Sequence, residues 1–430
     1  MHSTNDTSRR NFLQTCAVLG GAVLPTRLLA ADAPPPDSWL LAPQDAPRDL
    51  TPTGNANLGS LYADAMTLAN ENRYAYSFLG GRFRTLDEFK AAAREKLSEA
   101  LAYQPDRVDP RPEVIDTVDM GDYVREKIVF STSPHFRVPA YVLVPKAAKT
   151  TPAPAMVDLH SHGGMYLFGK EKVVDLGAGR NHAAMGPYHL ENYEGRPTAT
   201  ELVRRGYVVI TIDAFMFGER RLMMDEDLAQ GFDRARYSLD DVTRLNAKCR
   251  AREATLAKSL VFAGTTWPGI VAWDDMRTID YLASRPEVDP RRIGCVGVSM
   301  GGYRAAYLAG LDERIAAACV AGFMSSVRPM IHRHIDTHSW VHFLPGLHRW
   351  LDLPDVVSLM APRPLLVLQC SRDALFPLAG MEDAVRTLSA VYAKAGGSDR
   401  FTGRFYNVPH IFNRQMQDDA FAWLDGRLKG

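Results

Sequence analysis

The chain has 430 residues, of which 46% are hydrophobic and 23% are charged. These proportions are typical of a globular protein with a large core, and they exclude a disordered or fibrous chain. The 50 basic residues balance the 50 acidic ones, so no net charge would draw the chain to nucleic acid or to anionic lipid. We expect a small-molecule substrate and no nucleic-acid partner.

The first 33 residues resemble a twin-arginine export signal. Arg9 and Arg10 precede an apolar run over residues 16–24, and small residues follow near Ala31. The run is too short to span a bilayer. We therefore predict a signal peptide over residues 1–33, a periplasmic or extracellular protein, and no stable membrane insertion.

Residues 34–115 are predicted to form a linker followed by a helical extension. The segment 34–52 is rich in proline, alanine and aspartate without periodicity, which is typical of a linker. Residues 56–103 carry apolar side chains at helical spacing, as in Leu86, Phe89 and Ala93. The segment contains no motif that indicates chemistry.

The main domain is predicted over residues 116–430. It opens with two alternating segments, 123–130 and 138–144, that indicate an antiparallel pair. Short apolar runs then alternate with helical segments, which predicts an α/β fold whose mostly parallel central sheet carries helices on both faces. The predicted strands are 155–159, 207–212, 293–298, 315–321, 364–368 and 401–408, and a last helix spans 415–428.

Two long interruptions break this alternation, near residues 215–266 and 325–354. Insertions at the carboxyl edge of such a sheet commonly build substrate pockets, so we interpret both as cap elements. The cysteines outside the leader show no metal-type spacing, and we expect four free, buried thiols: Cys249, Cys295, Cys319 and Cys370.

The most informative motif is G-x-S-x-G at residues 297–301, between a predicted strand and a predicted helix. A sharp turn in that position presents the hydroxyl of Ser299 at a helix N-terminus, while the flanking glycines avoid collisions with neighbouring backbone. The N–H of Met300 would then point at a developing oxyanion. The pattern alone occurs by chance, but in strand-turn-helix context it predicts a nucleophile.

A serine nucleophile needs a base, and the base needs an acid that orients it. Where the nucleophile lies on such a turn, the acid and then the histidine follow it in the chain. Asp373 follows the strand at 364–370, although a turn or helix-capping role is its alternative. His410 is the only histidine after His348. Three aspartates in or next to the second interruption are the fallback acids: Asp336, Asp352 and Asp355.

A second oxyanion donor is expected after an early central strand. Glycines follow the strand at 155–159, and the N–H of Gly164, or of Gly163 if the loop turns earlier, could meet that of Met300. His160 and His162 share a face there, and we interpret them as braces of the loop because no third metal ligand has a recognisable spacing.

Two further groups of polar residues carry weaker signals. Histidines at 334, 338 and 342 repeat every four residues, which would stack them on a helix as cap or pocket-lining residues. Arg220 and Arg221 could anchor an anionic substrate, although arginines facing solvent are commoner. We predict no metal and no cofactor.

Several segments together resemble one superfamily: 160–164, 213–220, 273–277, 297–302, 353–356 and 361–364, with Asp373 and His410. They resemble the α/β-hydrolases, in particular the branch of dienelactone-hydrolase-like and bacterial acetyl xylan esterase-like proteins. The resemblance spans roughly residues 116–430. It implies hydrolysis of carboxylic esters, with small esters or acetylated carbohydrates as substrates. True dienelactone hydrolases use a cysteine nucleophile, so Ser299 favours an ordinary esterase.

Two other functions stay open at this stage. The first is a serine peptidase related to prolyl oligopeptidases, although the chain offers no propeller-like repeats upstream. The second is a non-catalytic binding protein on a hydrolase scaffold, which would have no need of a nucleophile, acid, base and oxyanion loop together. The sequence does not give the acyl chain length, the alcohol or the oligomeric state.

Overall fold

A nine-stranded mixed sheet forms the centre of the computed structural model, which describes residues 54–228 and 233–430. The predicted leader and the predicted linker at residues 34–52 lie outside the described residues. The strand order is β1-β2-β3-β5-β4-β6-β7-β8-β9, with antiparallel pairing as far as β5 and parallel pairing beyond it. The strands are β1 (Glu113–Asp119), β2 (Tyr123–Ser131), β3 (Arg137–Pro145), β4 (Ala153–Leu159), β5 (Val208–Ile212), β6 (Val288–Val298), β7 (Ile315–Ala321), β8 (Leu365–Cys370) and β9 (Phe401–Tyr406).

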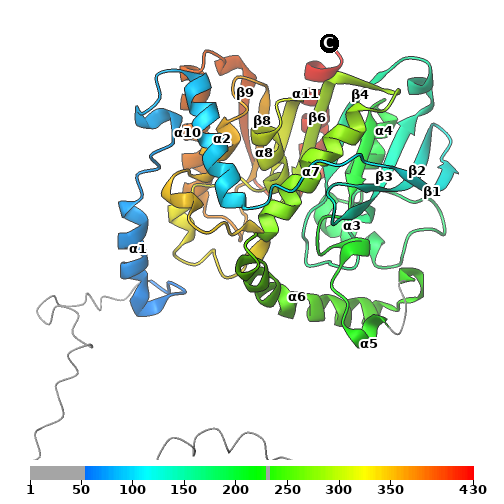
Figure 1. The fold of residues 1–430 in the computed structure, drawn as a ribbon, viewed down its shortest axis with the longest axis horizontal. Helices are drawn as coiled ribbons and strands as arrows, with labels where there is room; N and C mark the ends of the chain where they lie inside the picture. The colour runs from blue at the N-terminus through cyan, green and yellow to red at the C-terminus, as the bar shows by residue number, and fades with distance from the viewer. Residues whose placement is uncertain (1–53, 229–232) are drawn as a thin grey trace, which may run out of the picture. The chain divides into compact units, whose positions relative to one another are not determined.

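Helices cover both faces of this sheet, which confirms the predicted fold class (Figure 1). The central strands are apolar at nearly every position because alternate side chains enter different cores. On β6, for example, Cys295 belongs to one core and Val296 to the other. The first core is completed by α2 (Leu86–Leu101), α7 (Trp267–Ala283), α8 (Met300–Leu311), α9 (Leu353–Ser358) and α10 (Leu378–Lys394), and the second by α3 (Met185–Tyr193), α4 (Thr198–Arg204) and α11 (Arg414–Leu428).

Two helices precede the sheet, α1 (Tyr62–Glu71) and α2. A capping box fixes the start of α2: the Thr85 hydroxyl accepts from the N–H of Glu88, while the Glu88 carboxylate accepts from that of Thr85. The apolar stripe of α2 is fully buried in the first core. The extension is therefore an integral part of the packing.

The first interruption contains α5 (Asp225–Leu228) and the long helix α6 (Leu239–Phe262). Figure 1 shows α6 apart from the helices that cover the sheet. The second interruption holds three short 3₁₀ helices: η7 (Arg328–Met330), η8 (Trp340–His342) and η9 (Leu347–Arg349).

The prediction that His334, His338 and His342 stack along one helix is wrong. Residues 331–338 form turns, and His342 lies in the separate short helix η8. The ring of His338 contacts the backbone carbonyl of His334 through Nδ1 at 2.5 Å. A side chain that occupies this carbonyl competes with the amide that would continue a helix.

All four cysteines of the described chain are buried and free, as the sequence predicted. Burial raises the pKa of Cys249 and of Cys370 to about 11, which keeps both thiols protonated. None of the helices in the described part of the chain has the length and apolar character that crossing a bilayer requires.

Candidate active site

Ser299 occupies a strained turn between β6 and α8. Its φ and ψ are 59° and −124°, a region that non-glycine residues rarely adopt, and its N–H donates to the carbonyl of Ala321 at 3.0 Å. The two flanking positions require glycine for steric reasons. A Cβ on Gly297 would overlap the backbone of Gly301, and one on Gly301 would collide with the carbonyl oxygen of Leu159. The strand-turn-helix context predicted from the motif is therefore present.

Asp373 and His410 come together beside β8 and β9. The Nδ1 of His410 lies 2.5 Å from Oδ2 of Asp373, whose side chain is 1% exposed. The other oxygen of Asp373 accepts from the N–H of Leu375 at 2.8 Å. Because the carboxylate can only accept, Nδ1 carries the proton and Nε2 is left as the basic nitrogen.

None of the three fallback acids is bonded to His410, although Asp336 lines the same cavity as Ser299 and His410. Asp352 caps α9 and accepts from the N–H groups of Leu353 and Val327, while Asp355 completes the same capping box. Burial raises the pKa of Asp352 to about 7 and that of Asp355 to about 6. Asp336 is exposed. Of the four candidates, only Asp373 contacts His410.

Ser299 and His410 line one cavity of about 500 Å³. Nε2 of His410 is buried and has no hydrogen-bond partner among the described residues. The hydrogen bond between base and nucleophile is commonly long without substrate and tightens in the Michaelis complex. Both cap insertions contribute to the wall, through residues of α6 and of the segment 336–342.

The loop after β4 forms another side of this cavity. The N–H of Gly164 donates to Nδ1 of His162 at 3.0 Å and is therefore engaged. No hydrogen bond within the described chain engages the N–H of Gly163, whose φ is 52° and where a Cβ would overlap the ring of Tyr188. The geometry thus favours Gly163 over Gly164 as the partner of Met300, whose N–H opens α8 without an intrahelical acceptor.

Buried side chains fix this loop from the sheet side. The N–H of Ala214 donates to Nε2 of His160, so the proton of that ring is on Nδ1 and donates to the carbonyl of Ser161. Burial lowers the pKa of His160 well below its ordinary value, which keeps the ring neutral. Lys172 donates to the carbonyls of Ser161 and His162, at 2.9 Å each. His160 braces the loop.

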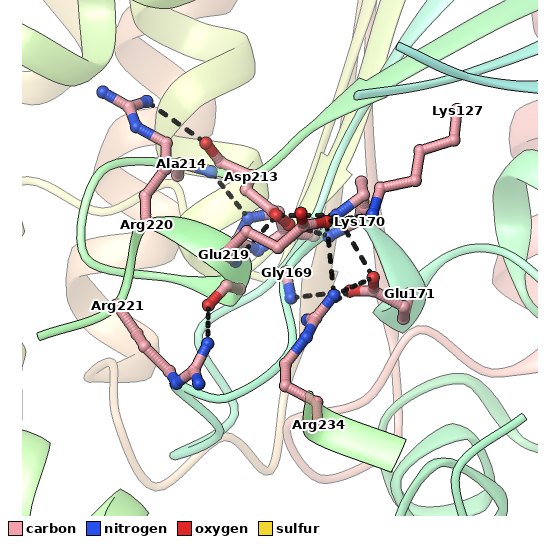
Figure 2. Close-up of polar contacts among 12 residues, drawn as sticks. Lys127, Gly169, Lys170, Glu171, Asp213, Ala214, Glu219, Arg220, Arg221 and Arg234 are labelled. Atoms are coloured by element: carbon pink, nitrogen blue, oxygen red, sulfur yellow. Dashed lines mark hydrogen bonds and ion pairs between the residues drawn. The ribbon is translucent and has the colours of Figure 1, made fainter. Parts of the chain in front are cut away.

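An ion network surrounds Lys170, whose ammonium group contacts the carboxylates of Asp213, Glu171 and Glu219 (Figure 2). The side chains of Lys170 and Asp213 are completely buried, and their nitrogen and oxygen lie 2.7 Å apart. Burial works to lower the pKa of Lys170, but the surrounding carboxylates outweigh it and raise that pKa. Asp213 also accepts from two backbone amides, so it fixes the turn after β5.

Glu253 of α6 joins the two caps to the loop, and no sequence motif pointed to it. Its carboxylate accepts from Nε2 of His162 at 3.0 Å and from the Tyr166 hydroxyl at 2.7 Å. It also accepts from the hydroxyl of Ser339 at 2.8 Å and from the N–H of Trp340 at 3.2 Å. Because Gly164 donates to Nδ1 of His162, the Nε2 of that ring carries its proton and points it at Glu253.

Arg220 and Arg221 are not solvent-facing. Arg220 donates to Asp274 at 2.7 Å, and Arg221 donates to the carbonyl of Gly218 at 3.1 Å. Both side chains are largely buried, so their role in the described chain is structural. No group of three or more His, Cys, Asp and Glu side chains is arranged to hold a metal within residues 54–228 and 233–430.

The model of the Abhydrolase family matches residues 63–386, well over half of the chain. The protein belongs to this family. The matched region contains Ser299 and Asp373 and ends before His410, and the match bears out the resemblance to α/β-hydrolases. The Abhydrolase-family chain is also 29% identical over 312 residues to "Putative hydrolase YtaP" of Bacillus subtilis (strain 168). The aligned residues cover 72% of this chain and 90% of the relative.

Solved structures share the fold of this Abhydrolase-family protein at low identity. A "putative acetyl xylan esterase" from Bacteroides fragilis NCTC 9343 is 19% identical, with a TM-score of 0.59 over 80% of this chain and 82% of that chain. A glucuronoyl esterase from Solibacter usitatus is 14% identical, with a TM-score of 0.52 over 82% and 94%. At these identities the likeness establishes the fold.

Proposed function

We propose that this protein is a serine hydrolase of carboxylic esters that acts through an acyl-enzyme intermediate. One observation carries the proposal: a serine on a strained elbow shares a cavity with an imidazole whose far nitrogen is held by a buried carboxylate. The esterases named among the structural relatives support the choice of ester over peptide substrates.

In the proposed first step His410 Nε2 takes the proton of Ser299 Oγ as this oxygen attacks the ester carbonyl. Asp373 holds the imidazole in the required tautomer and stabilises its cation. The N–H groups of Met300 and Gly163 stabilise the oxyanion, and His410 then protonates the leaving alcohol. Water attacks the acyl-Ser299 ester by the same route and releases the carboxylic acid.

The decisive test replaces Ser299 by alanine. Turnover of p-nitrophenyl acetate should fall on the order of 10⁶-fold, because loss of the nucleophile removes the covalent pathway. Circular dichroism should show an intact fold, since the side chain at 299 packs into no core. Wild-type protein should react with a fluorophosphonate probe and the variant should not.

Retained turnover in the variant would remove Ser299 from the mechanism. Cleavage of peptide anilides without cleavage of esters would favour the peptidase alternative. A wild-type protein that neither labels nor turns over any ester would instead indicate a binding protein on a hydrolase scaffold.

A further inference from the structure

A second cavity of about 460 Å³ lies next to the catalytic one, and the two share a wall. Four rings form most of that wall: Phe323, His338, His342 and Phe376. Phe323 follows β7 closely and Phe376 follows Asp373 by three residues, so the second cavity borders the catalytic groups. We call it the apolar chamber.

The chamber differs from the catalytic cavity in its lining. The catalytic cavity contains Arg250, Glu253 and several hydroxyl groups. In the chamber the only charged lining residue among the described ones is Asp336, which both cavities share. Apart from the shared rings, the lining is mostly aliphatic or aromatic: Leu58, Val327, Met330, Ile331, Ile335 and Phe343. Such a surface gains free energy when an apolar group replaces water against it.

The shared wall is weakly fixed at one ring. Neither nitrogen of His342 has a hydrogen-bond partner among the described residues. Its ring packs edge-on against Tyr303 and His338, with centroids 5.0 and 5.7 Å apart, and tilted against Phe323 at 5.4 Å. Burial lowers the pKa of His342 well below its ordinary value, so the ring is neutral. His410, in contrast, is anchored by Asp373. The His342 ring can therefore turn without breaking a hydrogen bond.

We propose that the apolar chamber binds an alkyl or aryl group of the ester substrate, with His342 as a movable partition between this chamber and the catalytic cavity. This inference rests on the proposed esterase function and specifies its substrate class. The preferred esters then carry an apolar group larger than acetyl on one side of the scissile bond. The catalytic cavity receives the group on the other side of that bond.

The first experiment measures kcat/KM for two ester series. One extends the acyl group of p-nitrophenyl esters from acetyl to octanoyl, and the other extends the alcohol of acetate esters from ethyl to octyl. Each methylene transferred from water to an apolar site should raise kcat/KM about fourfold until the chamber is full. The series that rises identifies whether the acyl or the alcohol group occupies the chamber.

Two variants tie the chain-length effect to this chamber. Ile331 lines the chamber and not the catalytic cavity, so Ile331→Trp should fill it and lower the ratio of long-chain to acetate kcat/KM at least tenfold. His342→Ala removes the partition and should raise that ratio. Leu190→Trp, on an exposed face of α3 that lines neither cavity, is the matched control and should leave the ratio unchanged.

The proposal is overturned if neither series rises above its two-carbon member, or if the rise persists in Ile331→Trp. A lowered ratio in His342→Ala would refute the movable partition. These results differ from failure of the esterase function itself, in which wild-type protein would hydrolyse neither p-nitrophenyl acetate nor any longer ester.

Discussion

Replacing Glu253 by glutamine tests whether this carboxylate holds the caps on the oxyanion loop. Oε1 accepts from His162, Tyr166 and Ser339, and Oε2 accepts from the N–H of Trp340. A glutamine can keep its carbonyl oxygen at the first position. Its amide nitrogen then faces the N–H of Trp340, which places a donor against a donor.

The expected cost follows from these contacts. The unpaired N–H of Trp340 costs about 1–3 kcal/mol, and three bonds to a charged acceptor become weaker neutral ones. Together these two effects should lower the free energy of unfolding by about 2–4 kcal/mol. Solvent does little to compensate, because the Glu253 side chain is only 9% exposed. Urea denaturation measures this decrease in stability. Tyr166→Phe is the matched control, because it removes one donor of the four, keeps the ring and should cost about 1 kcal/mol.

The same contribution should depend on pH. Burial works to raise the pKa of Glu253, but the hydrogen bonds from His162 and its other donors outweigh burial and hold the pKa below the ordinary 4.5. A group whose pKa is lowered by folding stabilises the folded state above its unfolded pKa and loses that effect as pH falls through its folded pKa. The stability difference between wild type and Glu253→Gln should therefore be full above pH 4.5 and shrink below it.

Two results would refute this reasoning. The first is a Glu253→Gln protein that unfolds at the same urea concentration as wild type at pH 7. The second is a difference in stability that stays constant from pH 7 down to pH 3. Either result would mean that the four contacts of Glu253 contribute little to holding the insertions in place.

Two further variants test the elbow and the acid. Asp373→Asn should lower kcat for p-nitrophenyl acetate about 10⁴-fold with an intact fold, because an amide no longer selects the tautomer of His410. A loss below tenfold would contradict the role of Asp373 as the acid that orients His410. Gly301→Ala should destabilise the protein by more than about 3 kcal/mol or prevent folding, because its Cβ would collide with Leu159. Gly186→Ala, which meets open space in α3, should shift the melting temperature little, and equal shifts in the two alanine variants would refute the steric argument.

The sequence located most of the sheet because its signal is local. Strands buried on both faces are continuous apolar runs. The bounds of β4 to β8 agree with the predicted segments to within a few residues, except that β6 begins five residues before its predicted start at 293. β1 was not predicted. It lies at the edge of the sheet with almost every residue exposed, and Glu113, Asp116 and Asp119 interrupt its alternation. An edge strand with solvent on both faces has no apolar pattern to detect.

The same distinction separates the predicted from the unpredicted site residues. Ser299, Asp373 and His410 each follow a strand, so chain order and the shared edge of a parallel sheet were enough to place them together. Glu253 lies in a helix with charges around its circumference, and its partners come from residues 162–166 and 339–340. The spacing of residues within one helix does not predict contacts with segments so distant in the chain. From the sequence alone, a glutamate in such a helix is expected to be a solvated surface charge.

The loop at 160–164 is held on two sides by different parts of the molecule. Lys172 fixes it from the buried side by donating to the carbonyls of Ser161 and His162, and His160 fixes it there by accepting from the N–H of Ala214. Glu253 fixes it from the cap side through His162, and the same carboxylate binds the second cap through Ser339. A substrate that displaces either cap must therefore strain the carboxylate contact that orients the loop. In this arrangement the caps, which line the proposed substrate cavity, are mechanically coupled to the proposed oxyanion donor, so changes in the caps should alter kcat as well as KM.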